Sequence, residues 1–198
     1  MKKVIIAMLI VLMVPACIFA GRGLFDLTVG ATAESTYDIQ KVQDAINNDG
    51  EFKFSTADIG FGADVEAKLA FVAVDARGVY APAQKTISGI VSANLAFDIF
   101  FIRVKAGLGY EYNYNFDTKE IYFGTGKNVT SDFADYQNAA FDACVGVDFL
   151  IGGLTIGAHA SLPTSVTIAQ NNWADLIPTI KDNWQYAKLG VTVGIALL

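Results

Sequence analysis

The segment RVKAGLGYEYNYNF, residues 103–116, alternates apolar and polar side chains with a period of two residues. Such a period predicts a β-strand, because successive side chains of a strand point to opposite faces. The apolar face changes along the segment, from three aliphatic side chains to four successive aromatic ones: Val104, Ala106, Leu108, Tyr110, Tyr112, Tyr114 and Phe116. One face of this predicted strand therefore passes from an aliphatic to an aromatic environment.

The composition of the chain is apolar for a protein of its size. Of its 198 residues, 53% are hydrophobic and 17% are charged, and the mean hydropathy is +0.39. After the first residues, however, no apolar run approaches the roughly 20 residues that a membrane-spanning helix needs. The apolar residues therefore belong either to a very large core or to strands that face lipid.

Residues 1–20 are predicted to be a secretory signal peptide. Lys2 and Lys3 precede an apolar run over residues 4–19, and the small residue Ala20 precedes Gly21. Cleavage after Ala20 leaves residues 21–198 as a single barrel domain, and loss of the two lysines changes the net charge from −6 to about −8. A chain this acidic is not expected to bind nucleic acid.

The two cysteines have different expected fates. Cys17 lies within the predicted signal peptide, so Cys144 is alone in the secreted chain and has no partner for an internal disulfide. The alternative is that Cys17 becomes a lipidated N-terminus, because residues 14–17 (VPAC) loosely resemble the lipobox of bacterial lipoproteins. Pro15 departs from that pattern, which favours cleavage after Ala20. Cys144 is interpreted as a small buried filler.

The alternation of residues 103–116 recurs in seven other segments of similar length. Together the predicted strands are residues 24–36, 57–67, 71–80, 87–98, 103–116, 137–150, 154–162 and 185–197. The connections at residues 37–56, 117–136 and 163–183 are long, whereas only a few residues follow the second, fourth and sixth strands. Eight such strands predict an all-β, antiparallel up-and-down barrel, and this asymmetry of loops is typical of a transmembrane barrel.

Alternation alone does not say which face of the barrel lies outside. A soluble, lipocalin-like ligand-binding barrel turns its apolar face inward, whereas an outer-membrane barrel turns it toward lipid. Aromatic residues favour lipid, because they collect here at both ends of the strands, as they do at headgroup levels. The predicted girdles are Phe25, Phe71, Phe97 and Phe149 at the tight-turn rim, and Tyr80, Tyr110, Tyr112, Tyr114, Trp184 and Tyr186 at the long-loop rim. The soluble barrel remains the alternative.

The polar face of the same strands is expected to line the barrel lumen. Its titratable residues carry both signs of charge, as they must if ionised groups are to pair away from bulk water. The predicted interior network consists of Asp26, Glu34, Asp64, Glu66, Asp75, Arg77, Asp98, Arg103, Lys105, Glu111, Asp142, Asp148, His159 and Lys188, with glycines between them that make room for long side chains. An eight-stranded barrel is just wide enough for its side chains to fill it, so a wide pore is not expected.

The chain resembles the small eight-stranded outer-membrane barrels of the OmpA transmembrane-domain, OmpX and OmpW type. The resemblance is architectural: it covers nearly all of residues 23–198 and rests on the signal peptide, the strand number, the loop asymmetry and the girdles. The last strand resembles their C-terminal insertion signal at Lys188, Gly190, Val193 and Ile195, although Leu198 replaces the usual aromatic residue. The resemblance implies a bacterial outer-membrane location, outer-membrane lipid and the barrel-assembly machinery as partners, and a structural or narrow-passage function without a cofactor.

His159, the only histidine, stands two residues before Ser161 on the polar face of its predicted strand. This spacing resembles the pair of the outer-membrane lipid A deacylases, in which a serine attacks an acyl ester and the histidine accepts its proton. Those enzymes present the pair toward lipid and add a carboxylate downstream, whereas here the pair faces inward and only Asp175, in a loop, follows nearby. A histidine in the lumen network is the favoured interpretation, and neither enzyme activity nor a metal site is expected.

The long loops offer surface recognition as a further functional alternative. Within residues 38–50, Ile39, Val42 and Ile46 have the spacing of a short helix that ends at a glycine. Residues 171–184 (NNWADLIPTIKDNW) are more apolar than an exposed loop normally is. This second segment is expected either to fold over the barrel mouth or to lie at the headgroup layer of the membrane.

Overall fold

The computed structural model describes residues 24–40, 43–44, 47, 56–123 and 139–197. Its strands are β1 (Phe25–Asp38), β2 (Ile59–Leu69), β3 (Val72–Ala81), β4 (Thr86–Ile99), β5 (Ile102–Asn115), β6 (Glu120–Phe123), β7 (Ala140–Ile151), β8 (Leu154–Thr167) and β9 (Lys188–Ala196). All eight predicted strands are present. The ninth strand, β6, lies within the predicted loop of residues 117–136. It was not predicted, because its four residues are too few to show a period of two.

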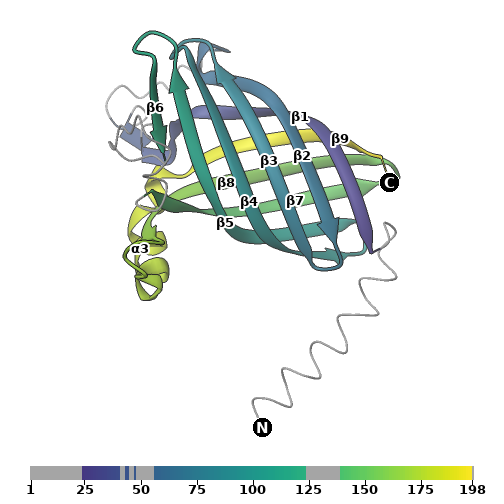
Figure 1. The fold of residues 1–198 in the computed structure, drawn as a ribbon. Coiled ribbons are helices and arrows are strands. Elements are labelled where there is room, and N and C mark those ends of the chain that lie inside the picture. The colour runs from purple at the N-terminus through teal and green to yellow at the C-terminus, as the bar shows by residue number, and fades with distance from the viewer. Residues whose placement is uncertain (1–23, 41–42, 45–46, 48–55, 124–138, 198) are drawn as a thin grey trace.

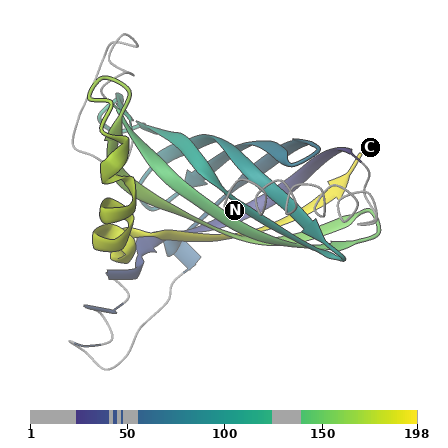
Figure 2. The ribbon, with the colours of Figure 1, turned by 90° about the horizontal axis from the view of Figure 1, so that it is seen from below.

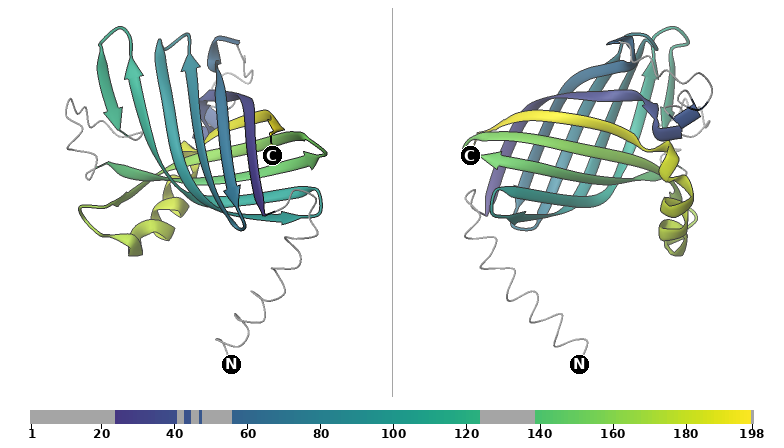
Figure 3. Two further views of the ribbon diagram at one scale, coloured as in Figure 1. Left: turned by 45° about the vertical axis from the view of Figure 1, so that its right-hand side comes forward. Right: turned by 180° about the vertical axis from the view of Figure 1, so that it is seen from behind.

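The sheet closes on itself into a barrel (Figures 1 and 3). Each of the eight long strands pairs antiparallel with its neighbours in the order β1-β2-β3-β4-β5-β7-β8-β9, and β9 returns to pair with β1. β6 stays outside this ring, because it pairs only with the last residues of β5, from Tyr112 to Asn115. The prediction of an eight-stranded, antiparallel, up-and-down barrel is therefore confirmed.

The tight turns at one end of the barrel contain two residues each. They join Leu69 to Val72, Ile99 to Ile102, and Ile151 to Leu154. The first residue of each turn is left-handed, with a φ of 55° at Ala70, 56° at Phe100 and 59° at Gly152. Two-residue hairpins require such positive φ values if the strands are to keep their twist.

Gly152 provides a test of this geometry. A Cβ atom at Gly152 would meet nothing within 4 Å, so the Gly152→Ala variant suffers only the cost of a left-handed alanine. We expect a loss of about 1–2 kcal/mol in the free energy of unfolding, measured by denaturant titration of the refolded barrel. Gly153→Ala is the matched control, because Gly153 is equally open but has no positive φ. Equal losses in the two variants would contradict the assignment of strain to residue 152.

The long connections lie at the opposite end of the barrel, and the predicted loop of residues 163–183 contains more structure than expected. β8 continues to Thr167 and is followed by η3 (Trp173–Asp175), α3 (Leu176–Asn183) and η4 (Trp184–Tyr186). Figure 2 shows α3 at the end of the barrel opposite to the C-terminus. In the predicted loop helix of residues 38–50, Asp38 is the last residue of β1 and residues 39–40, 43–44 and 47 are helical. The remaining residues of that segment lie outside the described residues. No helix in the described ranges has the length and apolar character needed to span a membrane.

Candidate functional site: an ion-paired lumen

Burial alternates along the strands in the sense opposite to that of a water-soluble protein. In β3, the outward residues Val72 and Val74 are exposed, whereas the inward residues Asp75 and Arg77 are only 6% exposed. In β7, outward Val145 is 54% exposed, whereas inward Asp148 is 5% exposed. In water-soluble proteins charged side chains are mostly exposed, so the burial of charges next to exposed aliphatic residues is the informative observation here.

The structure places the residues of the predicted interior network in the lumen. The buried members are Asp26, Asp64, Glu66, Asp75, Arg77, Asp98, Arg103, Lys105, Glu111, Asp142 and Asp148. The side chains of Glu34, His159 and Lys188 are 12%, 11% and 24% exposed. Glu34, late in β1, and Lys188, the first residue of β9, lie toward the long-loop end, whereas His159 lies near the middle of β8.

Lys68 belongs to the same network, although it lies just beyond the predicted strand of residues 57–67. β2 continues to Leu69, so Lys68 still points inward, where it is 1% exposed and donates to Asp98 Oδ2 at 2.9 Å. The signal was present in the sequence, because Lys68 continues the two-residue period of Asp64 and Glu66. The turn is shorter than predicted and leaves Lys68 within the strand.

Arg103 forms the centre of the cluster nearest to the tight turns. Its Nε donates to Asp98 Oδ1 at 2.7 Å, its Nη2 donates to Asp26 Oδ2 at 2.6 Å, and its Nη1 donates to Glu66 Oε1. The planar guanidinium supplies five donors in a fixed arrangement, which suits several carboxylates at once. Arg103 on β5 therefore connects β1, β2 and β4 across the lumen. We call Arg103, Asp26, Glu66, Asp98 and Lys68 the Arg103 cluster.

Lys105 extends these contacts one step further along the lumen. Its Nζ contacts Glu66, Asp148 Oδ2 at 2.9 Å and Asp75 Oδ2 at 3.7 Å. Glycines provide the space: a Cβ atom on Gly146 would lie 3.0 Å from Lys105 Cε, and one on Gly157 would lie 2.2 Å from Asp148 Oδ1. Glycine at these inward positions is what allows long charged side chains to meet inside a narrow barrel.

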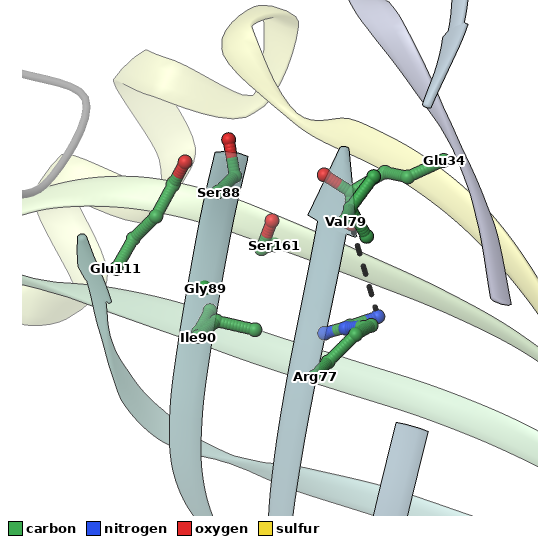
Figure 4. A pocket seen from close by; sticks show the side chains of 8 residues that line it. All are labelled: Glu34, Arg77, Val79, Ser88, Gly89, Ile90, Glu111 and Ser161. Atoms are coloured by element: carbon green, nitrogen blue, oxygen red, sulfur yellow. Dashed lines mark ion pairs between the residues drawn. The ribbon is translucent and has the colours of Figure 1, made fainter. Parts of the chain in front are cut away.

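A second group of charges lies nearer to the long loops. Lys188 on β9 donates to Glu111 on β5, and Arg77 Nη1 lies 4.0 Å from Glu34 Oε2. Figure 4 shows Arg77 and Glu34 facing each other on one side of a small cavity, with Glu111 on the opposite side and Ser88 between. Pairs of opposite charge thus bridge the lumen both near the tight turns and near the long loops.

The histidine and serine that resemble a deacylase pair do not form a lipid-facing site. Both point into the lumen, where the His159 ring contacts Thr192 Oγ1 at 3.4 Å and Glu34 Oε2 at 3.6 Å. Ser161 lines a different cavity from the one that His159 lines. Asp175 lies in η3, where it accepts from Asn172 Nδ2 at 3.3 Å. The geometry that the resemblance requires, a pair open to lipid, is absent from these described residues.

Two small cavities lie between the lumen side chains, each with a volume of about 10 Å³. One is lined by Glu34, Arg77, Val79, Ser88, Gly89, Ile90, Glu111 and Ser161 (Figure 4), and the other by Thr28, Asp64, Glu66, Asp75, Lys105, Asp148, Thr155, His159 and Thr192. This volume is about what one water molecule needs. Side chains thus leave room for single water molecules at these two points.

The described lumen is acidic overall. Its carboxylates are Asp26, Glu34, Asp64, Glu66, Asp75, Asp98, Glu111, Asp142 and Asp148, and its Lys and Arg residues are Lys68, Arg77, Arg103, Lys105 and Lys188. Within the described part of the chain, no group of three or more His, Cys, Asp or Glu residues is placed to hold a metal ion. Most of these carboxylates instead lie within 4.0 Å of a Lys or Arg nitrogen.

Cys144 reports on access to this lumen. It is a free thiol on the inward face of β7 and is 5% exposed. We expect the folded barrel to resist an aqueous maleimide for a time that fully labels the unfolded chain, because cavities the size of one water molecule do not admit the reagent. Lys85→Cys in a Cys144→Ser background, in an exposed turn with the Lys85 side chain 58% exposed, is the control and should react at once. Rapid labelling of Cys144 in the folded protein would show an open lumen.

The predicted girdle residues lie on the outer wall or at its rims. Phe25, Phe71 and Phe149 are exposed toward the tight turns, and Tyr80, Tyr112, Trp184 and Tyr186 are exposed toward the long loops. Phe97, Tyr110 and Tyr114 are half-buried, the last two beneath aromatic neighbours: Tyr110 lies 4.4 Å from Phe141 and Tyr114 lies 5.1 Å from Phe116 between ring centroids. An apolar exterior with aromatic rims and a charged interior is the polarity of the transmembrane β-barrel class.

Comparison with known proteins adds a likeness in structure but none in sequence. No protein-family model matches the chain, and no curated protein matches it in sequence. Among solved structures, the crystal structure of Neisserial surface protein A (NspA) aligns with a TM-score of 0.39 and 12% sequence identity, over 88% of this chain and 96% of that one. The assignment of the fold therefore rests on the strand pairing of this chain.

Proposed function

We propose that this chain is an integral protein of a bacterial outer membrane, with lipid around the barrel and a lumen closed by its own side chains. The observation that carries the proposal is the inverted polarity of the wall: Val145, Val191 and Val193 are more than half exposed, whereas Asp26 and Arg103 are at most 1% exposed. Water around this wall would leave an extended apolar surface unburied, which soluble monomers avoid.

The dimensions of the wall support a membrane-spanning role. The eight barrel strands have 9–14 residues, and a tilted strand needs about 9–11 residues to cross the hydrocarbon. The predicted signal peptide would direct the chain across the inner membrane, and the barrel-assembly machinery is the proposed route of insertion. In this orientation the tight turns face the periplasm and the long loops face outward.

Spin labels at Val104 and Val145 test the contact with lipid. Both residues are outward and exposed, on β5 and β7. In reconstituted vesicles, we expect labels at these positions to be relaxed by oxygen dissolved in the bilayer and protected from a water-soluble nickel relaxant. A label at Lys85, in an exposed turn of the long-loop end, should show the opposite preference. Aqueous access at Val104 and Val145, or a soluble protein whose gel mobility is unchanged by boiling, would refute the proposal.

The filled lumen supports a structural role over that of a diffusion pore. The Arg103 cluster and the Lys188–Glu111 pair bridge the interior at two levels, and the cavities between them have the size of one water molecule. In planar bilayers, we expect no stable conductance steps of porin size. Any narrow passage should favour cations, since carboxylates outnumber Lys and Arg among the described lumen residues. A large, steady or anion-selective conductance would contradict a closed, acidic lumen.

Surface recognition by the long loops stays a prediction. Many residues of the predicted loops 37–56 and 117–136 lie outside the described residues. Deletion of one loop at a time, followed by a binding assay on surfaces that bear the protein's host partners, would test this role without disturbing the barrel.

A further inference from the structure

The segment from Ile168 to Ala187, here called the α3 segment, packs against the outer wall of the barrel. Outward residues of β7 are exposed along most of the strand, yet Ala143, on the same face as Val145, is only 9% exposed. Ala143 forms a buried cluster with Leu162 and Ala187, and Ile180 of α3 packs against that cluster. Burial of outward-facing side chains requires cover from outside the barrel, so the α3 segment does not fold into the mouth.

Polar contacts attach the α3 segment to the end of β8. Asn183 Nδ2 donates to the carbonyl oxygen of Pro163 at 3.2 Å, and the hydroxyl groups of Thr179 and Ser165 lie 2.8 Å apart. Asn172 Nδ2 donates to the carbonyl oxygen of Ser165 at 3.1 Å. These contacts hold one side of α3 against the barrel wall.

Trp173 is fixed to the wall by an aromatic contact. Its ring centroid lies 5.4 Å from that of Phe141, which in turn packs against Tyr110. Trp173 nevertheless remains 45% exposed. The indole therefore has one side on the barrel and another side turned outward.

α3 runs across the barrel axis. Figures 1, 2 and 3 all show it to one side of the long-loop end, at a steep angle to the strands. If the barrel axis is close to the membrane normal, as the proposed function requires, α3 lies roughly in the plane of the membrane at the level of one headgroup layer. This is the orientation of an interfacial amphipathic helix.

The exposed surface of the segment carries large apolar side chains near the apolar wall, with Lys181 and Asp182 also exposed on the helix. Ile177 is 72% exposed, and Ile168 and Trp184 are 45% and 51% exposed. Trp184 leads through η4 directly into β9, whose outward residues Leu189 and Val191 are exposed on the lipid-facing side. The exposed apolar surface thus continues from the barrel wall onto the α3 segment.

We propose that the α3 segment is an interfacial anchor that inserts Ile177, Trp173 and Trp184 into the outer leaflet of the same membrane. This inference rests on the proposed function, and its ligand is lipid at the boundary between headgroups and acyl chains. Interfacial helices bury their apolar face about 5–10 Å into this boundary, and tryptophan prefers the same level. The segment then holds the rim of the barrel at a fixed depth.

Tryptophan fluorescence tests this anchor directly, because Trp173 and Trp184 are the only two tryptophans of the chain. The full chain reconstituted in phosphatidylcholine vesicles should lose emission when the lipid is brominated near the headgroup end of the acyl chain. It should lose less when bromine is near the methyl end, and iodide in the buffer should quench it little. Trp173→Phe and Trp184→Phe assign the signal to each indole. Strong iodide quenching without bromolipid quenching would show a solvated loop and overturn the inference.

A reporter on the wall separates this inference from the proposed function. Val191→Trp in a Trp173→Phe, Trp184→Phe background should be quenched by the bromolipids, because Val191 is outward on β9 and 55% exposed. If this reporter is quenched and the native tryptophans are not, the anchor fails and the membrane barrel stands. If the reporter itself is quenched by iodide alone, the membrane barrel fails.

Two substitutions on α3 test the role of its outward side. Ile177→Ser should weaken bromolipid quenching of Trp184 and increase its quenching by iodide, because the variant loses the most exposed apolar side chain of the helix. Asp182→Ser, at an exposed polar position of the same helix, is the matched control and should leave both signals unchanged. Gel mobility before and after boiling confirms that each variant is folded. Equal behaviour of the two folded variants would overturn the inference.

Discussion

Replacement of Arg103 by methionine is expected to lower the free energy of unfolding of the barrel by about 3–5 kcal/mol. The guanidinium holds Asp26, Glu66 and Asp98 in a place where the arginine side chain is 1% exposed. Methionine keeps much of the length but leaves these carboxylates without that cation, and an uncompensated buried charge costs far more than a broken surface pair. Denaturant titration of the reconstituted protein, followed by the heat-modifiable gel band, measures the loss.

Lys85→Met is the control for Arg103→Met. Lys85 pairs with Asp117 at 3.0 Å, but the two side chains are 58% and 62% exposed, so its loss should cost less than about 1 kcal/mol. Asp26→Asn combined with Arg103→Met should destabilise less than the sum of the two single variants, because the two residues interact directly. Equal losses for Arg103→Met and Lys85→Met would mean that the cluster contributes nothing special to stability.

The barrel itself was predictable because its two solvents impose a strict period on the sequence. In residues 103–116, every outward residue is apolar and the inward ones are charged, polar or glycine, so the strand and its two faces follow from the alternation. The aromatic residues at the strand ends then indicate which of the two faces meets lipid. Irregular positions escaped this reasoning. β8 runs to Thr167 past a register shift between Ala140 and Asp142, and such a bulge breaks the period that marks a strand.

The membership of the lumen network was largely readable from the sequence, but its pairings were not. Asp26 and Asp98 are far apart in the chain, and they meet at Arg103 because of the stagger between strands around the closed ring. That stagger depends on the whole barrel and leaves no local signal. The packing of α3 could not be predicted for a similar reason. The sequence of residues 171–184 shows that the segment is apolar, but only the structure shows that it packs against the outer face of the barrel.

Each barrel strand carries charged side chains toward the lumen and apolar side chains toward the exterior, and the two faces contribute differently to stability. A buried ion network contributes little net stability relative to an apolar interior, since desolvation offsets much of the attraction between charges. In a membrane, however, an apolar lumen would remove the difference between the two faces of each strand. The charged lumen is therefore best explained as specifying which face turns inward, which complements the stability that lipid contact gives the outer face.

Val145→Arg is expected to destabilise the reconstituted barrel by about 2–4 kcal/mol, whereas Val72→Arg should cost about 0–1 kcal/mol. Both valines are outward and exposed, at 54% and 43%, but Val145 lies midway along β7 and Val72 is the first residue of β3, beside a tight turn. Arginine at mid-wall must desolvate in hydrocarbon, whereas arginine at the rim reaches the headgroups. Denaturant titrations in vesicles give both values. A wall in water would tolerate both substitutions within about 0.5 kcal/mol, so the depth dependence separates a lipid-facing barrel from a soluble one of the same fold.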